Sequence, residues 1–209
     1  MIHKTLKISF VFLVGLTGCG LITVPASTNI KSEKIASPNM VIQKLYLLTP
    51  PLMATNLGTH FFDRSFDDYF LQAMMGCNIQ ATSSFDYHFQ YFKAHPAILP
   101  QDKPEIDNHD QASIKNAKPD AVLEIKPVSY SSIGARAVAF VSFEAQLVSY
   151  PSGNKLWTAD IDLNPGSNFH TGNGQISASL ALAYGIAKQI RQDKVVGPCA
   201  SSMPEPQPN

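Results

Sequence analysis

The chain has few cysteines and no motif that would gather metal ligands. Only three cysteines occur in 209 residues, none as Cys-x-x-Cys, and the histidines form neither His-x-His nor His-Glu-x-x-His. We therefore predict no metal site and no cofactor, although a site built from residues far apart in the sequence stays open. The histidines are expected to be solvated, His88 on the polar face of a strand and His95 in a loop. Those beyond the N-terminal segment are His60, His88, His95, His109 and His170.

Signatures of catalysis are missing as well. No Gly-x-Ser-x-Gly elbow indicates a serine hydrolase. Gly172-Asn173-Gly174 precedes a predicted helix but lacks the rest of a nucleotide-binding fingerprint, so a flexible turn explains it. Asp160 and Asp162 share a predicted strand face, where two solvated acids are commoner than a catalytic pair. We predict no catalytic residue and expect that the protein is not an enzyme.

Positive charge is not in excess. Lys and Arg number 16, as do Asp and Glu, and removing residues 1–18 takes away only Lys4 and Lys7. The remaining chain then has 14 basic and 16 acidic residues and a net charge of −2. Without a basic stripe to neutralise phosphates, a nucleic-acid partner is not expected.

Long apolar runs are limited to the N-terminus. A basic start is followed by the run Ile8 to Leu16, too short to cross a bilayer core of about 30 Å, and then by Leu16-Thr17-Gly18-Cys19. This order predicts a lipoprotein signal peptide over residues 1–18, cleavage before Cys19, and palmitate-type acylation of that cysteine as a membrane anchor. Gly20 stands where an Asp would favour inner-membrane retention in enteric-type bacteria. We therefore expect an outer-membrane lipoprotein facing the periplasm, with inner-membrane retention and surface exposure left open.

Composition divides the rest of the chain. Residues 19–38 are predicted to be the lipidated N-terminus and a flexible tether, because Leu21 to Pro38 holds few large apolar side chains. Residues 200–209 are predicted to be a Pro-rich disordered tail. Residues 39–199 between them are long enough for one periplasmic domain with a core of its own.

Hydrophobic periodicity predicts the elements of that domain. Alternation with period two predicts strands, and spacing of three and four predicts helices. We expect an α+β fold: a single domain in the order β-α-β-α-β-β-β-α, with a mixed β-sheet and helices packed on one face. The strands are expected near 40–48, 85–91, 121–126, 137–147 and 157–163, and the helices near 62–75, 107–117 and 175–192.

Two cysteines remain once Cys19 is acylated. Because the periplasm is oxidising, Cys77 and Cys199 are expected to form a disulfide bond. Both follow predicted helices, which could meet on the sheet. The alternative is that Cys77 is a buried free thiol.

The C-terminal half resembles a known group of proteins. It has the run Ala117-Lys118-Pro119-Asp120-Ala121-Val122-Leu123-Glu124-Ile125, then a long strand, a Ser-Gly turn, Lys155-Leu156-Trp157 and a last amphipathic helix. This pattern, over about residues 117–194, resembles the GNA1162-like, curli-secretion and penicillin-binding-protein-activator type of periplasmic lipoprotein, related in fold to the N-terminal domain of the Tol-Pal translocation protein. That group has Ala-Asp-Ala at the strand start and Gly-Lys at the hairpin, whereas here Pro119 precedes Asp120 and Asn154 follows Gly153. The resemblance implies an assembly role through fold analogy alone.

Three functions follow from these features. The first is a non-catalytic adaptor or assembly factor that binds an envelope protein. The alternative is an accessory lipoprotein of a transporter that binds a lipid or small apolar ligand, and an unrecognised hydrolase is third. Tyr130, Ile133, Tyr150 and Ser152 are the predicted partner-binding residues, because apolar and aromatic side chains at turns are enriched at interfaces. These tyrosines could instead simply cap the hairpin ends.

Overall fold

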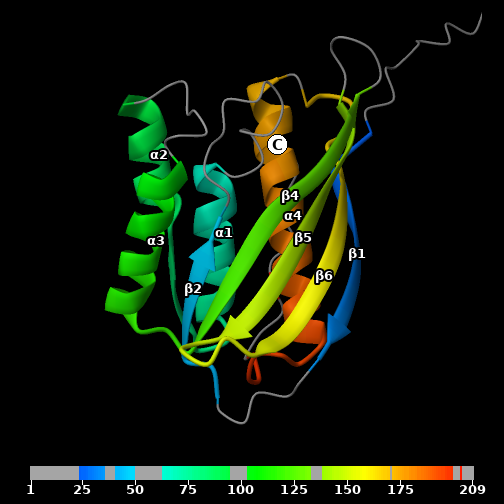
Figure 1. Cartoon of the computed structure of the whole chain (residues 1–209). Helices are drawn as coiled ribbons and strands as arrows, with labels where there is room; N and C mark the ends of the chain where they lie inside the picture. Colours follow the sequence, from blue (N-terminus) through cyan, green and yellow to red (C-terminus); the bar gives the residue numbers. More distant parts are fainter. Residues whose placement is uncertain are drawn as a thin grey trace, which may run out of the picture.

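The computed structural model describes residues 24–35, 41–49, 63–94, 103–132, 138–169, 171–199 and 203. In chain order, the elements are β1 (Ser27–Lys34), β2 (Lys44–Leu48), α1 (Arg64–Met75), β3 (Gln80–Ser83), α2 (Phe85–Ala94), α3 (Lys103–Ala117), β4 (Ala121–Ser132), β5 (Val138–Ser149), β6 (Lys155–Asn164) and α4 (Gly172–Gln192). The strands form one mixed sheet in the order β1-β6-β5-β4-β2-β3 (Figure 1). β4, β5, β6 and β1 are antiparallel neighbours, whereas β2 pairs in parallel with both β4 and β3. The predicted α+β class and mixed sheet are confirmed.

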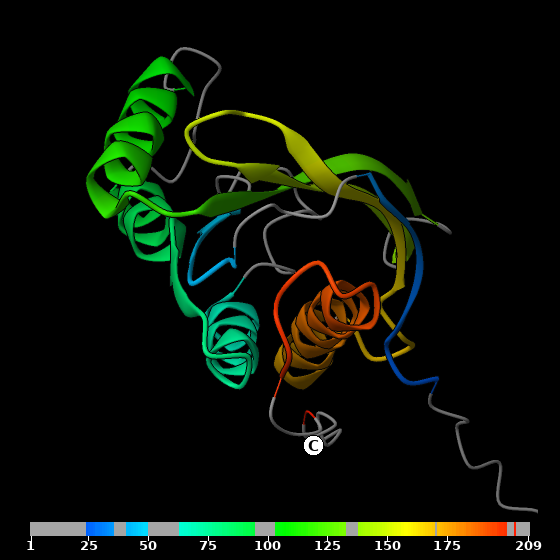
Figure 2. The same ribbon diagram turned by 90° about the horizontal axis from the view of Figure 1, so that it is seen from below.

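The core lies between the sheet and the helices α1 and α4, which cover the same face of the sheet (Figure 2). On β5, Val141, Phe143, Ala145 and Leu147 are buried and their neighbours are partly or fully exposed, the period of two expected for a half-buried strand. α4 contributes the buried side chains Ala178, Leu182, Ala183, Ile186, Ala187 and Ile190. The helix-covered face therefore holds the main hydrophobic core, and the opposite face of β4, β5 and β6 carries polar side chains.

One end of the sheet is covered on both faces. Leu45 and Leu47 of β2 belong to the main core, and Tyr46, which points the other way, is also buried. Burial and the negative charge of Asp110 raise the pKa of Tyr46, and a hydrogen bond from Ser113 lowers it. Both partners are on α3, so α3 packs over the second face at the β2 end. The prediction that the helices pack on one face holds for α1 and α4 but not for α3.

The prediction of a flexible tether over residues 19–38 is wrong for Ser27–Lys34. These residues form β1, an edge strand that pairs with β6 in register Ile30 to Ile161. Gly185 of α4 makes room for it, because a Cβ at that position would lie 2.3 Å from Thr28 Oγ1 and 3.1 Å from Ile30 Cδ1. As an edge strand, β1 packs one large apolar side chain, Ile30, toward α4. Because its other residues are mostly polar, its composition resembles that of a tether.

The strand predicted over residues 85–91 is also wrong, because this segment is helix α2. Aromatic residues at every second position also satisfy the i, i+4 spacing of a helix. Phe85 and Phe89 stack with ring centroids 5.8 Å apart, and Tyr87 and Tyr91 lie at the same distance. With β1 and β3 added, the order is β-β-α-β-α-α-β-β-β-α and not the predicted one.

Smaller differences concern element ends. α3 begins at Lys103, four residues before the start predicted near residue 107. α4 begins at Gly172, where Thr171 is the N-cap and its hydroxyl accepts a hydrogen bond from the Gly174 amide at 3.1 Å.

In the predicted tail, Met203 packs against the core, and the other tail residues lie outside the described residues. Among the described helices, none has the length and apolar character needed to span a membrane.

Candidate functional site

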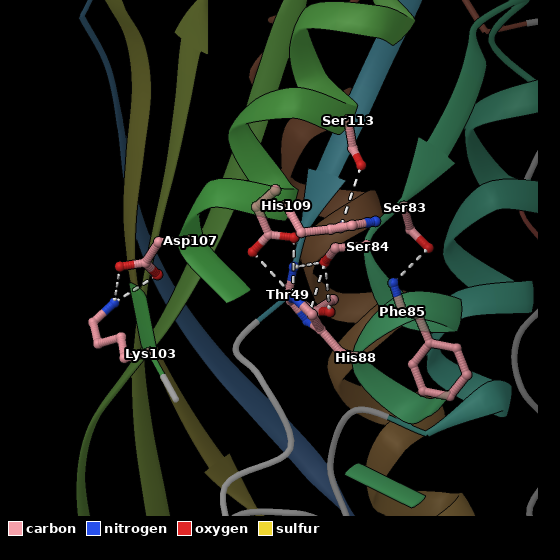
Figure 3. A network of polar contacts seen from close by, with 10 residues as sticks. Thr49, Ser83, Ser84, Phe85, His88, Lys103, Asp107, His109 and Ser113 are labelled. Carbon is pink, nitrogen blue, oxygen red and sulfur yellow. Dashed lines mark hydrogen bonds and ion pairs between the residues drawn. The ribbon is translucent and has the colours of Figure 1, made fainter. Parts of the chain in front are cut away.

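A buried polar cluster joins β2, α2 and α3. Its members are Thr49, Ser84, His88 and Asp110, and we call it the His88 cluster (Figure 3). His88 Nε2 lies 3.0 Å from both carboxylate oxygens of Asp110, and His88 Nδ1 lies 3.4 Å from Ser84 Oγ. All four residues are buried, with Ser84 and His88 each 2% exposed. Side-chain contacts therefore connect a serine to a histidine and the same histidine to an aspartate, as in a hydrolase triad.

Local structure explains why these residues meet. Ser84 stands just before α2, and the His88 amide donates to its carbonyl at 3.1 Å as part of the first helical turn. This places Ser84 and His88 four residues apart on one face of the helix. Asp110 lies in the middle of α3. It and Ile106 are the two buried residues of that helix. The cluster thus forms where three elements pack together.

The chemistry of the cluster favours a structural role. Ser84 Oγ accepts a hydrogen bond from the Thr49 backbone amide at 3.1 Å and lies 3.3 Å from Thr49 Oγ1, in addition to its contact with His88. A nucleophile needs an approach for its substrate, whereas two hollows in the described part of the chain, one between β1 and α4 and one on β4, β5 and β6, are lined by no member of this cluster. The cluster therefore satisfies buried polar groups where β2, α2 and α3 meet.

The sequence prediction for His88 is wrong. We expected a solvated side chain on a strand, and the structure places a buried side chain on a helix. The error follows from the assignment of residues 85–91 as a strand. The spacing of four between Ser84 and His88 was the available signal, but Asp110 is 22 residues from His88 and no local pattern joins them.

Two carboxyl groups lie at the start of α1. Asp63 is the N-cap and accepts from the Phe66 amide at 3.1 Å, while Asp67 is buried one turn later. Burial raises the pKa of both carboxyl groups, against the lowering effect of hydrogen bonds that include those from the Phe66 amide to Asp63 and from Ser83 to Asp67. Asp67 Oδ1 has no hydrogen-bond partner among the described residues. No third ligand-type group joins them, since the described part of the chain contains no group of three or more His, Cys, Asp or Glu placed to hold a metal ion.

A groove of about 1090 Å³ runs between β1 and α4. Its walls include Pro25, Ala26 and Ile30 on one side and Leu180, Ala181 and Tyr184 on the other. Among the described residues of the lining, Lys188 is the one with a charged side chain, and its Nζ lies 5.3 Å from the centre of the Tyr184 ring. The groove is open to solvent and none of its described lining residues is acidic, so it suits an apolar or anionic ligand better than a cationic one.

The predicted partner-binding residues whose backbone the structure describes lie at two separate ends of the β4–β5–β6 strands. Tyr150 and Ser152 lie in the β5–β6 turn, where Ser152 is exposed and its Oγ is 2.6 Å from Ser149 Oγ. The backbone of Tyr130 pairs with Val141 near the opposite end of β4 and β5. Ile133 lies outside the described residues. The two hairpin ends are separated by most of the length of the strands, so they would contact different partners or different parts of one partner.

The cysteines behave as predicted where the structure describes them. Cys77 and Cys199 form a disulfide that joins the end of α1 to the segment after α4, which confirms the predicted pair. α1 and α4 are neighbours on the sheet, as this bridge requires (Figure 2). Cys19 lies outside the described residues, so its acylation stays a prediction.

The two motifs that carried the resemblance have structural roles. Asp120 Oδ2 accepts hydrogen bonds from the backbone amides of Gln43 and Lys44 at 2.8 and 2.9 Å, which fixes the start of β2 beside β4. Trp157 is fully buried, and its indole Nε1 donates to Asp193 Oδ2 at 2.6 Å. These residues determine how the hairpin and the last helix pack.

Comparisons with known proteins add little beyond the arrangement of elements. No protein-family model matches the chain, and no curated protein matches it. Among solved structures, it is similar to the PelC dodecamer from Paraburkholderia phytofirmans (10% identity, TM-score 0.41, 75% of this chain and 95% of that chain). It is also similar to lipoprotein GNA1162 from Neisseria meningitidis (20% identity, TM-score 0.35, 71% of this chain and 99% of that chain), a member of the group that the sequence resembles. Both TM-scores are below 0.5, so neither likeness carries an argument about function.

Proposed function

We propose that this protein is a lipid-anchored lipoprotein of the bacterial envelope that acts as a non-catalytic adaptor for another envelope protein. The observation that carries the proposal is the uncovered face of β4, β5 and β6. The described helices α1 and α4 pack only on the other face, so these strands present a polar surface on a rigid sheet. The export signal before Cys19 and the disulfide both fit an oxidising compartment outside the cytoplasm.

The uncovered face carries paired polar side chains. Gln146 hydrogen-bonds to Glu124, Lys126 Nζ lies 2.9 Å from Glu124 Oε1, and Ser142 donates to Asp162 Oδ1 at 2.7 Å. The Gln146–Glu124 and Ser142–Asp162 pairs join neighbouring strands, the Lys126–Glu124 pair lies within β4, and all three limit the freedom of the side chains on this face. Such a surface suits recognition of a protein partner by hydrogen bonds and charge, with the Tyr150–Asn154 turn at its edge.

Crosslinking in intact cells tests this proposal. Photoreactive residues at Ser152 and at Thr158 of β6 are expected to give discrete adducts with the same envelope protein, because both positions belong to the presented surface. Gln72, an exposed residue on α1, is the matched control and should give no such adduct. Equal and diffuse labelling from all three positions would contradict the adaptor function.

The β1–α4 groove favours a second candidate, an accessory lipoprotein that binds a lipid or small apolar ligand. An Ala181→Trp variant, which fills part of the groove, distinguishes the two. Loss of a copurifying lipid with unchanged crosslinking from Ser152 would support ligand binding as a separate property. Loss of the crosslinks without loss of lipid would count against it.

A further inference from the structure

The chain is fixed to the domain only a few residues after the predicted anchor. The Val24 amide donates to Ser167 Oγ at 3.0 Å, and the Ser167 amide donates to the Val24 carbonyl at 3.0 Å. Gly166 allows this close approach, because a Cβ there would lie 2.7 Å from the Val24 oxygen. Cys19 precedes Val24 by five residues, which can span at most about 18 Å when fully extended. The end of the domain that holds Val24 must therefore stay close to the lipid surface.

This end is formed by residues 24–27, 164–169 and 171–177, and we call it the anchor-proximal end; it lies at the top of Figure 1. The sequence has no Asp, Glu, Lys or Arg from Leu163 to Ala187, nor from Val24 to Ile30. The opposite end of the same two elements is rich in charge, with Lys31, Glu33 and Lys34 on β1 and Lys188, Arg191 and Asp193 on or just after α4. Charge is therefore divided between the two ends.

Apolar side chains are exposed on the uncharged end. Val24 is 48% exposed and lines the β1–α4 groove, and Ile176 on α4 is 38% exposed. Placing a surface against lipid is costly when charged groups lose their water and favourable when apolar groups do. The anchor-proximal residues 24–27, 164–169 and 171–177 therefore include exposed apolar side chains and no charged one. The charged residues Asp63 and Arg64 lie beside this end, at the start of α1, where Asp63 hydrogen-bonds with Ser179 of α4.

We propose that the anchor-proximal end rests against the phospholipid surface of the membrane that holds the anchor. This inference rests on the proposed acylation of Cys19 and adds the orientation of the domain. The short link brings this end to the membrane, and the uncharged surface keeps it there in preference to the charged sides of the molecule. We therefore expect this surface to contact lipid. Contact with a protein at the same surface would contradict this proposal.

The orientation determines which hairpin end can reach a partner. α4 has 21 residues, so it extends about 30 Å from the anchor-proximal end. The Tyr150–Asn154 turn, at the far end of β5 and β6, then faces away from the membrane, while the end of β4 at Ser132 and the start of β5 at Val138 lie on the membrane side. Of the two contact regions predicted from the sequence, the β5–β6 turn is the one presented to proteins in the periplasm.

Depth-dependent fluorescence quenching tests the orientation in the acylated full-length protein, reconstituted in phosphatidylethanolamine and phosphatidylglycerol vesicles. A fluorophore is attached through Asn173→Cys at the anchor-proximal end or Ser152→Cys at the far end, both exposed positions. Lipid-borne quenchers are expected to quench the Asn173 probe at least about twofold more than the Ser152 probe. Equal quenching of the two probes, or quenching of neither, would overturn the orientation.

A pair of charge substitutions provides the matched control. Ile176→Glu places a charge on the uncharged end and is expected to reduce quenching of the Asn173 probe about twofold. Val128→Glu makes the same change at an exposed residue of β4 and should leave quenching unchanged. Mass spectrometry of the same samples separates the two proposals. An acylated chain without preferential quenching refutes only the orientation, whereas a chain without acyl groups refutes both the anchor and the orientation derived from it.

Discussion

The double variant Cys77→Ala/Cys199→Ala is expected to lose about 2–4 kcal/mol of unfolding free energy. The disulfide joins residues 122 positions apart, so its removal lets the unfolded chain explore many more conformations. It also frees the segment after α4, where Val195 and Val196 are buried in the core. For a domain of this size, each 1 kcal/mol corresponds to about 2–4 °C in Tm, so thermal unfolding followed by circular dichroism measures the effect.

The single variant Cys199→Ala distinguishes the contribution of the disulfide to stability from that of the packing of the Cys77 side chain. It breaks the disulfide but leaves the Cys77 side chain in the core, where it is 5% exposed. Nearly the same loss is expected for the single and double variants. A Tm within about 2 °C of the unsubstituted protein for Cys199→Ala, corresponding to less than about 1 kcal/mol, would mean that the bridge does not stabilise the fold.

Replacing Asp110 with alanine is expected to destabilise the domain by about 2–3 kcal/mol. The substitution leaves His88 Nε2 without its partner in a place where water does not reach it, and a buried polar group without a hydrogen bond is costly. Chemical denaturation followed by tryptophan fluorescence reports the loss, since Trp157 is fully buried. Asp110→Asn, which keeps an acceptor, should lose less.

Asp107→Ala is the matched control on the same helix. Asp107 pairs with Lys103 at 2.8 Å, but both side chains are exposed, so the expected loss is below about 1 kcal/mol. Equal losses for Asp107→Ala and Asp110→Ala would contradict the structural role of the His88 cluster. A hydrolytic activity that disappears in a folded Ser84→Ala variant would instead identify the cluster as catalytic.

Much of the antiparallel half of the sheet could be predicted from the sequence, because local pattern and tertiary environment agree there. β5 and β6 each have one buried and one exposed face. In β5, the apolar residues Phe143, Ala145 and Leu147 at every second position show this pattern in the sequence itself. The disulfide was predictable from the number of cysteines and the compartment. α4 was predictable from apolar spacing, apart from its first residues.

The errors arise where one pattern fits two structures. The aromatic residues of α2 are spaced for both a strand and a helix, and contacts that favour the helix, such as that between His88 and Asp110, join residues far apart in the sequence. β1 is polar because it lies at an edge, so composition could not distinguish it from a linker. The separation of Tyr130 from Tyr150 follows from the strand register, which is known only once the pairing of β4 with β5 is known.

The most direct test of the account is the chemical state of Cys19 in cells that are fed labelled palmitate. The unsubstituted protein is expected in the membrane fraction with an N-terminal peptide that begins at Cys19 and carries acyl groups. The Cys19→Ser variant is expected to incorporate no palmitate. A Cys19→Ser protein that still takes up palmitate and stays in the membrane fraction would contradict the lipid anchor, and with it the membrane orientation.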